Sequence, residues 1–129
     1  MKIKINQQFL SILLIISLTN CSLNMSMQAK PAKIIFNIND INSQGLRGNQ
    51  TSMRSVSYEF CIPTDKDIAR KIKKIDPSLK LYSGARGRIN CNDIETLAIG
   101  NTHQSQWETI LLILSSQEYI NEIHETFSE

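Results

Sequence analysis

Residues 55–77 read SVSYEFCIPTDKDIARKIKKIDP, and this stretch decides the fold because two periodicities follow each other within it. Apolar and polar side chains first alternate with the period of a half-buried strand, whose apolar face holds Val56, Tyr58, Phe60 and Ile62. Pro63 ends this strand. Isoleucines then recur at the spacing of one helical face, at Ile68, Ile72 and Ile75. The stretch predicts a strand followed directly by an amphipathic helix.

Capping and stop signals mark the ends of the predicted helix. Thr64 is predicted to cap its amino end, with Asp67 three residues later in capping-box position. Asp76-Pro77 ends the helix, because proline disfavours helical geometry at the residue before it. The outward face is basic and carries Lys66, Arg70, Lys73 and Lys74.

Downstream of this helix the sequence predicts two more strands and a second helix. Residues 79–82 (LKLY) form the second strand, and the turn-rich residues 83–88 (SGARGR) follow it. Residues 94–99 form the third strand, which Gly100-Asn101 ends. The second helix is marked by an apolar stripe of Trp107, Ile110, Leu111 and Leu114.

The last element, residues 119–127, fits two periodicities. Ile120, Ile123 and Phe127 share a helical face, whereas Tyr119, Ile123 and Phe127 share a strand face. A strand completes the split βαβ arrangement of ferredoxin-like domains. A helix leaves a three-stranded sheet with helices on one face. We favour the strand, and a small α+β domain follows in either case.

The domain is predicted to span residues 54–129 and to follow a tether. Residues 21–53 are rich in Asn, Ser, Gln and Met and show little apolar periodicity, which is typical of a flexible linker. Residues 33–38 (KIIFNI) are the exception, since their composition is that of a strand. Two outcomes stay open for them: an edge strand added to the domain, or a disordered segment.

The amino terminus has the pattern of a secretory signal. Lys2 and Lys4 precede an apolar run over residues 9–18, and a short positive region followed by such a run marks an exported chain. The run is shorter than the ~20 residues that span ~30 Å of hydrocarbon.

The end of this signal, Leu18-Thr19-Asn20-Cys21, resembles the lipobox of bacterial lipoproteins. In that family the cysteine receives a thioether-linked diacylglycerol before cleavage. Asn20 departs from the pattern, which usually has Gly or Ala before the cysteine. The resemblance implies that residues 1–20 are a signal peptide and that Cys21 is lipidated. By resemblance to lipoproteins of Gram-negative bacteria, the absence of an Asp at position 22, which is Ser22, implies transfer to the outer membrane, facing the periplasm.

The charge of the mature chain argues against nucleic acid as a partner. Lys2 and Lys4 account for two of the 14 basic residues, so the +2 net charge falls to zero once they are removed. The charges are nevertheless segregated. Residues 66–88 hold eight cations and two carboxylates, and residues 89–129 hold seven carboxylates and no Lys or Arg.

Cys61 and Cys91 remain once Cys21 carries lipid, and an even number in an oxidising compartment predicts a disulfide. The bridge would close a loop of ~30 residues and contribute ~3 to 4 kcal/mol. The alternative is two free thiols acting as small apolar core residues. A free Cys61 would be a candidate nucleophile with His103 or His124 as its base, although no family signature surrounds them.

Arg86 and Arg88 are the candidate binding residues. They lie among glycines in residues 83–88, and their forked donors suit an acidic protein surface or a lipid headgroup. The loop lacks the context of a nucleotide-binding phosphate loop. His103 and His124 lack the i, i+4 spacing of a metal-binding pair. We therefore expect neither a cofactor nor a metal.

The sequence thus predicts a non-enzymatic binding or inhibitor-type module, anchored at the cell envelope. Its partner would be a protein or envelope component with an acidic surface, met through Arg86, Arg88 and the basic helix that precedes them. Two alternatives remain: a small envelope enzyme that uses Cys61 with His103, and a structural subunit of an envelope assembly.

Overall fold

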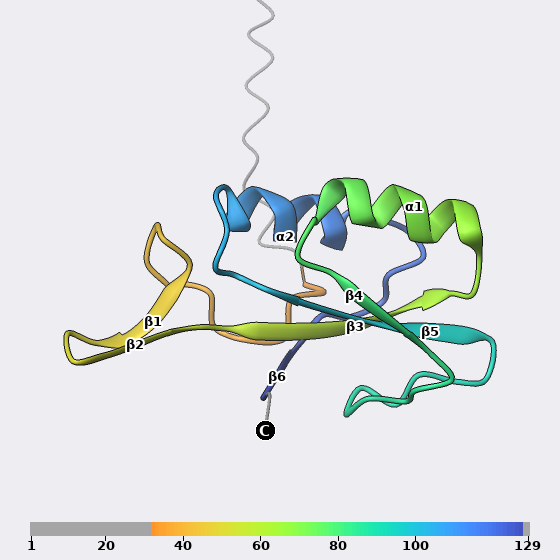
Figure 1. Cartoon of the computed structure of the whole chain (residues 1–129), viewed down its shortest axis with the longest axis horizontal. Helices are drawn as coiled ribbons and strands as arrows, with labels where there is room; N and C mark the ends of the chain where they lie inside the picture. Colours follow the sequence, from red (N-terminus) through yellow and green to blue (C-terminus); the bar gives the residue numbers. More distant parts are fainter. Residues whose placement is uncertain (1–31, 128–129) are drawn as a thin grey trace, which may run out of the picture.

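Residues 32–127 are described by the computed structural model, and they form two helices and six strands (Figure 1). The elements in chain order are β1 (Leu46–Asn49), β2 (Ser52–Ser55), β3 (Ser57–Pro63), α1 (Lys66–Ile75), β4 (Lys80–Ser83), β5 (Glu95–Asn101), α2 (Trp107–Ser115) and β6 (His124–Thr126). The predicted signal peptide and Cys21 lie outside the described residues.

The main sheet contains four antiparallel strands in the order β4-β5-β3-β6. β3 pairs with β5 along its whole length, from Ser57 opposite Asn101 to Pro63 opposite Glu95. Each helix therefore joins two strands that have one other strand between them, which is the split βαβ arrangement of ferredoxin-like domains. The predicted α+β class is confirmed, and the last element is a strand.

Both helices cover the same face of this sheet (Figure 1). The alternation in β3 directs Tyr58, Phe60 and Ile62 toward them, and all three side chains are buried. They belong to one core cluster with Ile72 of α1 and with Leu111 of α2. Since burying a large apolar side chain contributes about 1.5–3 kcal/mol, this layer holds the sheet and helices together.

The amino end of α1 is capped by Asp65, so the prediction that Thr64 is the cap is wrong. The Asp65 carboxylate accepts the backbone N–H groups of Asp67 and Ile68 at 2.8 and 2.9 Å. The Thr64 hydroxyl instead lies 2.9 Å from that of Thr96 on the neighbouring strand. A carboxylate at the helix terminus also interacts favourably with the helix dipole, which a hydroxyl does less well.

The carboxyl end of α1 is tied to the sheet by the buried Asp76. Its carboxylate accepts hydrogen bonds from the hydroxyls of Tyr58 and Ser78 and from the side-chain amide of Gln104. Gly100 packs against them, and a Cβ there would lie 2.8 Å from an Asp76 oxygen. Burial, and then the charge of Asp76, raise the pKa of Tyr58, so the phenol stays protonated and donates.

The folded part begins upstream of residue 54, so the prediction of a tether is wrong for residues 34–53. Ile34 forms a parallel bridge with Ile123, and Ile41 is buried in the core. The Trp107 indole N–H donates to the backbone carbonyl of Asn42 at 3.0 Å. The strand-like segment 33–38 therefore joins the fold through one bridge rather than as a regular strand. These contacts use isolated isoleucines and backbone groups, which leave no periodic pattern in the sequence.

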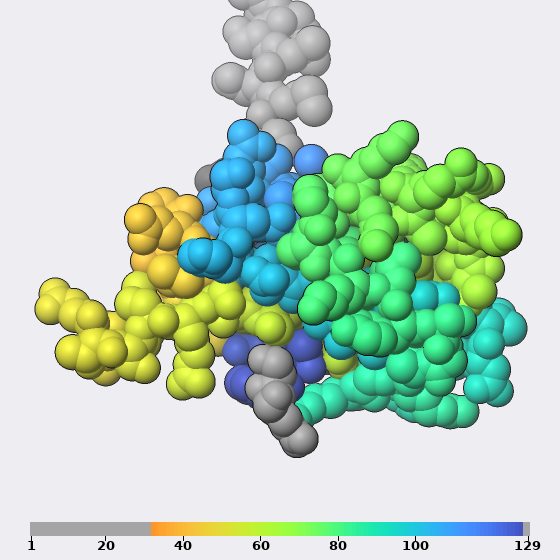
Figure 2. Space-filling view, in the orientation of Figure 1, coloured from red at the N-terminus to blue at the C-terminus, as the bar shows by residue number. Residues whose placement is uncertain are grey.

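β1 and β2 form a hairpin that projects from the domain (Figures 1 and 2). A two-stranded ribbon is marginally stable alone, so its base needs support. Arg47 provides it, with nitrogens 2.9 Å from the Asp40 carboxylate and 2.7 Å from the Glu125 carboxylate. The Thr102 hydroxyl donates to the carbonyl of Gly45 at 2.6 Å. These contacts fix the hairpin base to the β6 end of the sheet.

Candidate binding site

The face of the sheet opposite the helices carries the predicted site residues. Ser57, Glu59 and Cys61 of β3 point to this face, since successive side chains of a strand alternate. The connection between β4 and β5 folds back beneath it (Figure 1). We call residues 84–92 of this connection the clasp loop and this side of the sheet the open face.

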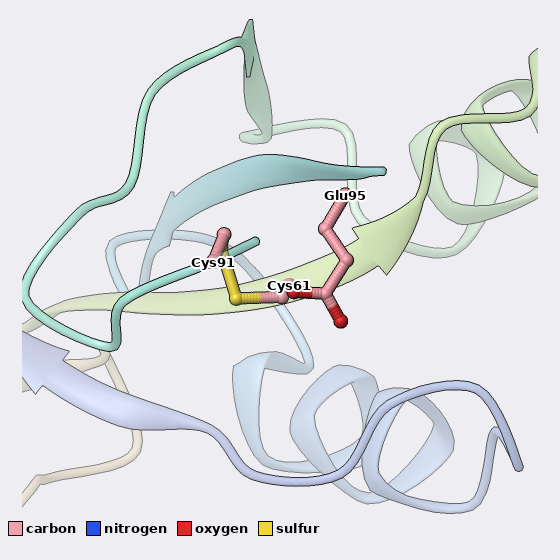
Figure 3. A group of neighbouring side chains, drawn as sticks. All are labelled: Cys61, Cys91 and Glu95. Carbon is pink, nitrogen blue, oxygen red and sulfur yellow. A yellow bond between two sulfur atoms is a disulfide. The ribbon is translucent and has the colours of Figure 1, made fainter. Parts of the chain in front are cut away.

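The first anchor of the clasp loop is a disulfide between Cys61 and Cys91. The S–S distance is 2.03 Å and the two Cα atoms lie 5.5 Å apart, so the predicted pairing is confirmed. Figure 3 shows the bridge joining the loop to β3, with Glu95 of β5 beside it. A bridged sulfur carries no thiolate, which is the form that acts as a nucleophile or a metal ligand. The geometry therefore gives the alternative of a Cys61 nucleophile no support.

The second anchor is Glu59, which the sequence analysis did not single out. Glu59 is 2% exposed, and its carboxylate accepts the backbone N–H of Ile89 at 2.7 Å. Gly87 packs closely over the same place, since a Cβ there would lie 2.7 Å from a Leu97 methyl and 3.2 Å from a Glu59 oxygen. The φ of Gly87 is also +65°, so the close approach and the backbone conformation both favour glycine.

The clasp loop exposes both predicted binding residues. Arg86 lies 3.2 Å from Asp93, but their side chains are 62% and 92% exposed, and so exposed a pair is weak. The Arg88 guanidinium lies 5.6 Å from the ring centroid of Phe127, within cation–π range. The loop thus combines a fixed backbone with two arginine side chains that a partner can reach.

The basic helix does not share this surface, which corrects the predicted arrangement. α1 lies in the helix layer, whereas the clasp loop lies on the open face (Figures 1 and 2). The two basic segments are close in sequence, but β4 leads the chain from one layer to the other. Arg86 and Arg88 therefore lie apart from Lys73 and Lys74.

A groove of about 250 Å³ lies on the open face, and Arg88 of the clasp loop lies over the ring of Phe127, one of its lining residues. We call it the basic groove; its main lining side chains are Ser57, Lys80, Tyr82, Ile99, Thr126 and Phe127. Tyr82 and Phe127 are 43% and 65% exposed, and accessible aromatic side chains are enriched at protein interfaces. Its volume falls below the about 300–1,000 Å³ of small-molecule sites, so it suits one or two side chains of a larger partner.

A second hollow, of about 170 Å³, has the opposite charge. Glu95 and Glu122 line it together with Asn90 and Asn121, and it adjoins Ile89 of the clasp loop. Its lining within residues 32–127 includes no Lys or Arg. The clasp loop therefore separates an acidic part of the open face from a basic one.

The two histidines do not complete a catalytic or metal centre with Cys61. His103 lies in the β5–α2 connection beside Ser43 and Gln44. Nε2 of His124 is 2.7 Å from a Glu122 oxygen. In the described part of the chain, the one group of three potential metal ligands within 4.8 Å is Cys61, Cys91 and Glu95 (Figure 3). Its two sulfurs are already joined to each other.

Sequence reasoning found the arginines and the cysteine pair but missed Glu59, Lys80, Tyr82 and Phe127 as site residues. A signal for Glu59 was present, because a carboxylate two residues before a bridged cysteine in a strand shares the cysteine's face. The other three come together only through strand pairing, which places Lys80 opposite Ile99 and Ser57 opposite Thr126.

The chain matches no protein-family model, no curated protein and no solved structure. None of the helices found within residues 32–127 is long and apolar enough to cross a bilayer.

Proposed function

We propose that this protein is a lipoprotein of the bacterial cell envelope whose domain binds a partner and catalyses no reaction. Acylation of Cys21 would hold it in the outer membrane, facing the periplasm, as the lipobox resemblance implies. Its partner is a protein or envelope component with an acidic surface. The observation that carries the proposal is the clasp loop, which exposes Arg86 and Arg88 on an anchored backbone.

Anchoring before binding supports this role. A loop that must become ordered on binding loses conformational entropy, and a loop already fixed avoids much of that loss. Ile89 and Cys91 fix the carboxyl half of the clasp loop, through the Glu59 carboxylate and the disulfide. A disulfide of this kind also suits a compartment outside the cytosol, as export through the predicted signal requires.

The two arginines provide the test. We expect Arg86→Ala together with Arg88→Ala to weaken capture of the partner about fivefold, since each exposed charge contributes about 0.5 kcal/mol. The remaining binding should depend less on salt. The measurement is affinity purification of the protein from its own detergent-solubilised envelope, at two salt concentrations, with quantification of what co-purifies.

Lys73→Ala together with Lys74→Ala is the matched control. It removes the same charge from exposed positions of α1, in the other layer of the domain. Capture should stay at the wild-type level in this variant. Undiminished capture by the double arginine variant would exclude the clasp loop as the binding element.

A further inference from the structure

We infer that the basic groove takes an acidic segment of the partner protein, in which an Asp or Glu carboxylate lies next to an apolar side chain. The inference rests on the proposed function, because the groove adjoins the loop to which that function assigns binding. Arg88 of the loop lies over Phe127, and Phe127 lines the groove. A partner bound at the clasp loop can therefore also contact the groove.

The charge of the groove favours a carboxylate. Lys80 lines the groove, and Arg88 adds a second cation beside Phe127. Within the described residues no carboxylate lines this groove. Glu95 and Glu122 instead line the hollow on the other side of the clasp loop. A partner that offers an acidic segment gains attraction here, whereas a basic segment meets like charge.

The lining of the groove also provides for an apolar side chain. Phe127 is 65% exposed and Tyr82 is 43% exposed, and Ile99 of β5 lies on the same face. An apolar side chain that enters would cover part of these rings and gain about 25 cal/mol for each Å² removed from water. The hydroxyls of Ser57 and Thr126 can pair with the backbone of a peptide.

The probe is a set of three short peptides that differ in one property each. The first is Gly-Asp-Phe-Asp-Gly with blocked ends, the second has Asn at both Asp positions, and the third has Ala in place of Phe. Each is titrated into the full-length protein in mild detergent, and amide chemical shifts are followed by NMR. We expect the first peptide to shift the signals of Lys80, Tyr82, Ile99 and Phe127.

Two substitutions test the charge. Lys80→Gln should weaken binding of the first peptide about threefold, as expected for the loss of one exposed ion pair. Lys74→Gln on α1 removes the same charge from the helix layer and should leave binding unchanged. The Asn peptide and the Ala peptide should each bind more weakly than the first. Equal binding of the Asn peptide, or absence of shifts at the groove, overturns the inference.

Two further measurements distinguish a peptide from other occupants of the groove. Binding of anionic phospholipid vesicles that Lys80→Gln abolishes, without peptide binding, would show a lipid site and overturn the inference. Sedimentation that gives a dimer lost in Lys80→Gln would show a second copy of the chain in the groove, with the same consequence. Capture of the envelope partner through Arg86 and Arg88 is measured in a separate experiment. The proposed function and the inference about the groove can therefore fail independently.

Discussion

At the scale of single residues, the contact between Tyr58 and Asp76 couples folding to pH. Burial holds the pKa of Tyr58 above its ordinary value of 10.0, so above this pH the folded state keeps a proton that the unfolded chain releases. The folded state then binds more protons, and the free energy of unfolding falls as pH rises. One proton corresponds to about 1.4 kcal/mol per pH unit. We expect urea denaturation curves to show this loss between about pH 10 and about pH 11.

Substitution at Tyr58 isolates this effect from the other titrating groups. Tyr58→Phe removes the proton but leaves Asp76 with one donor fewer, which lowers stability at neutral pH by about 1–3 kcal/mol. Above about pH 10, the free energy of unfolding of this variant should fall with pH less steeply than that of the wild type, by the equivalent of about one proton. Tyr82→Phe, at an exposed position, should keep the wild-type slope. An unchanged slope in Tyr58→Phe would refute the coupling.

At the scale of elements, the clasp loop depends on its disulfide. The bridge joins residues 30 apart in sequence and restricts the unfolded chain, which corresponds to about 3–4 kcal/mol. We expect Cys61→Ala together with Cys91→Ala to lower the free energy of unfolding by this amount and to speed hydrogen exchange at Ile89. Urea denaturation and NMR exchange measure the two effects. Reductant should destabilise the wild type and leave the double variant unchanged. Equal stability of the wild type and the double variant without reductant would contradict the role assigned to the bridge.

The elements themselves could be predicted where one local pattern decides them. The alternation that ends at Pro63 and the isoleucine spacing after it gave β3 and α1 because each periodicity lies within a few residues. The β1–β2 hairpin was not predicted, because it is held by long-range contacts such as that of Arg47 with Glu125. The basic groove was not predicted for the same reason, because Lys80 and Phe127 come to line one groove only after the strands have paired.

At the scale of the whole molecule, the charges that are segregated along the sequence also lie in different layers of the fold. The basic side chains of α1 lie in the helix layer, while Arg86, Arg88 and Lys80 lie at the open face. The acidic hollow of Glu95 and Glu122 shares that face across the clasp loop. The basic surface at the open face therefore has a defined position beside an acidic one, and under the proposed function this arrangement favours one orientation of binding.

Lipid attachment at Cys21 would act on this binding by confining it to one membrane surface. A partner in the same envelope then meets the clasp loop at a raised effective concentration, so modest affinity suffices. We expect Cys21→Ser to move the protein from the membrane fraction to the soluble fraction, because it removes the sulfur to which the proposed lipid would be attached. In intact cells, crosslinking to the partner should fall. In detergent extracts, where confinement no longer operates, capture through Arg86 and Arg88 should equal that of the wild type. Retention of Cys21→Ser in the membrane fraction would assign the attachment to another part of the molecule, and equal crosslinking would show that affinity alone brings the partners together.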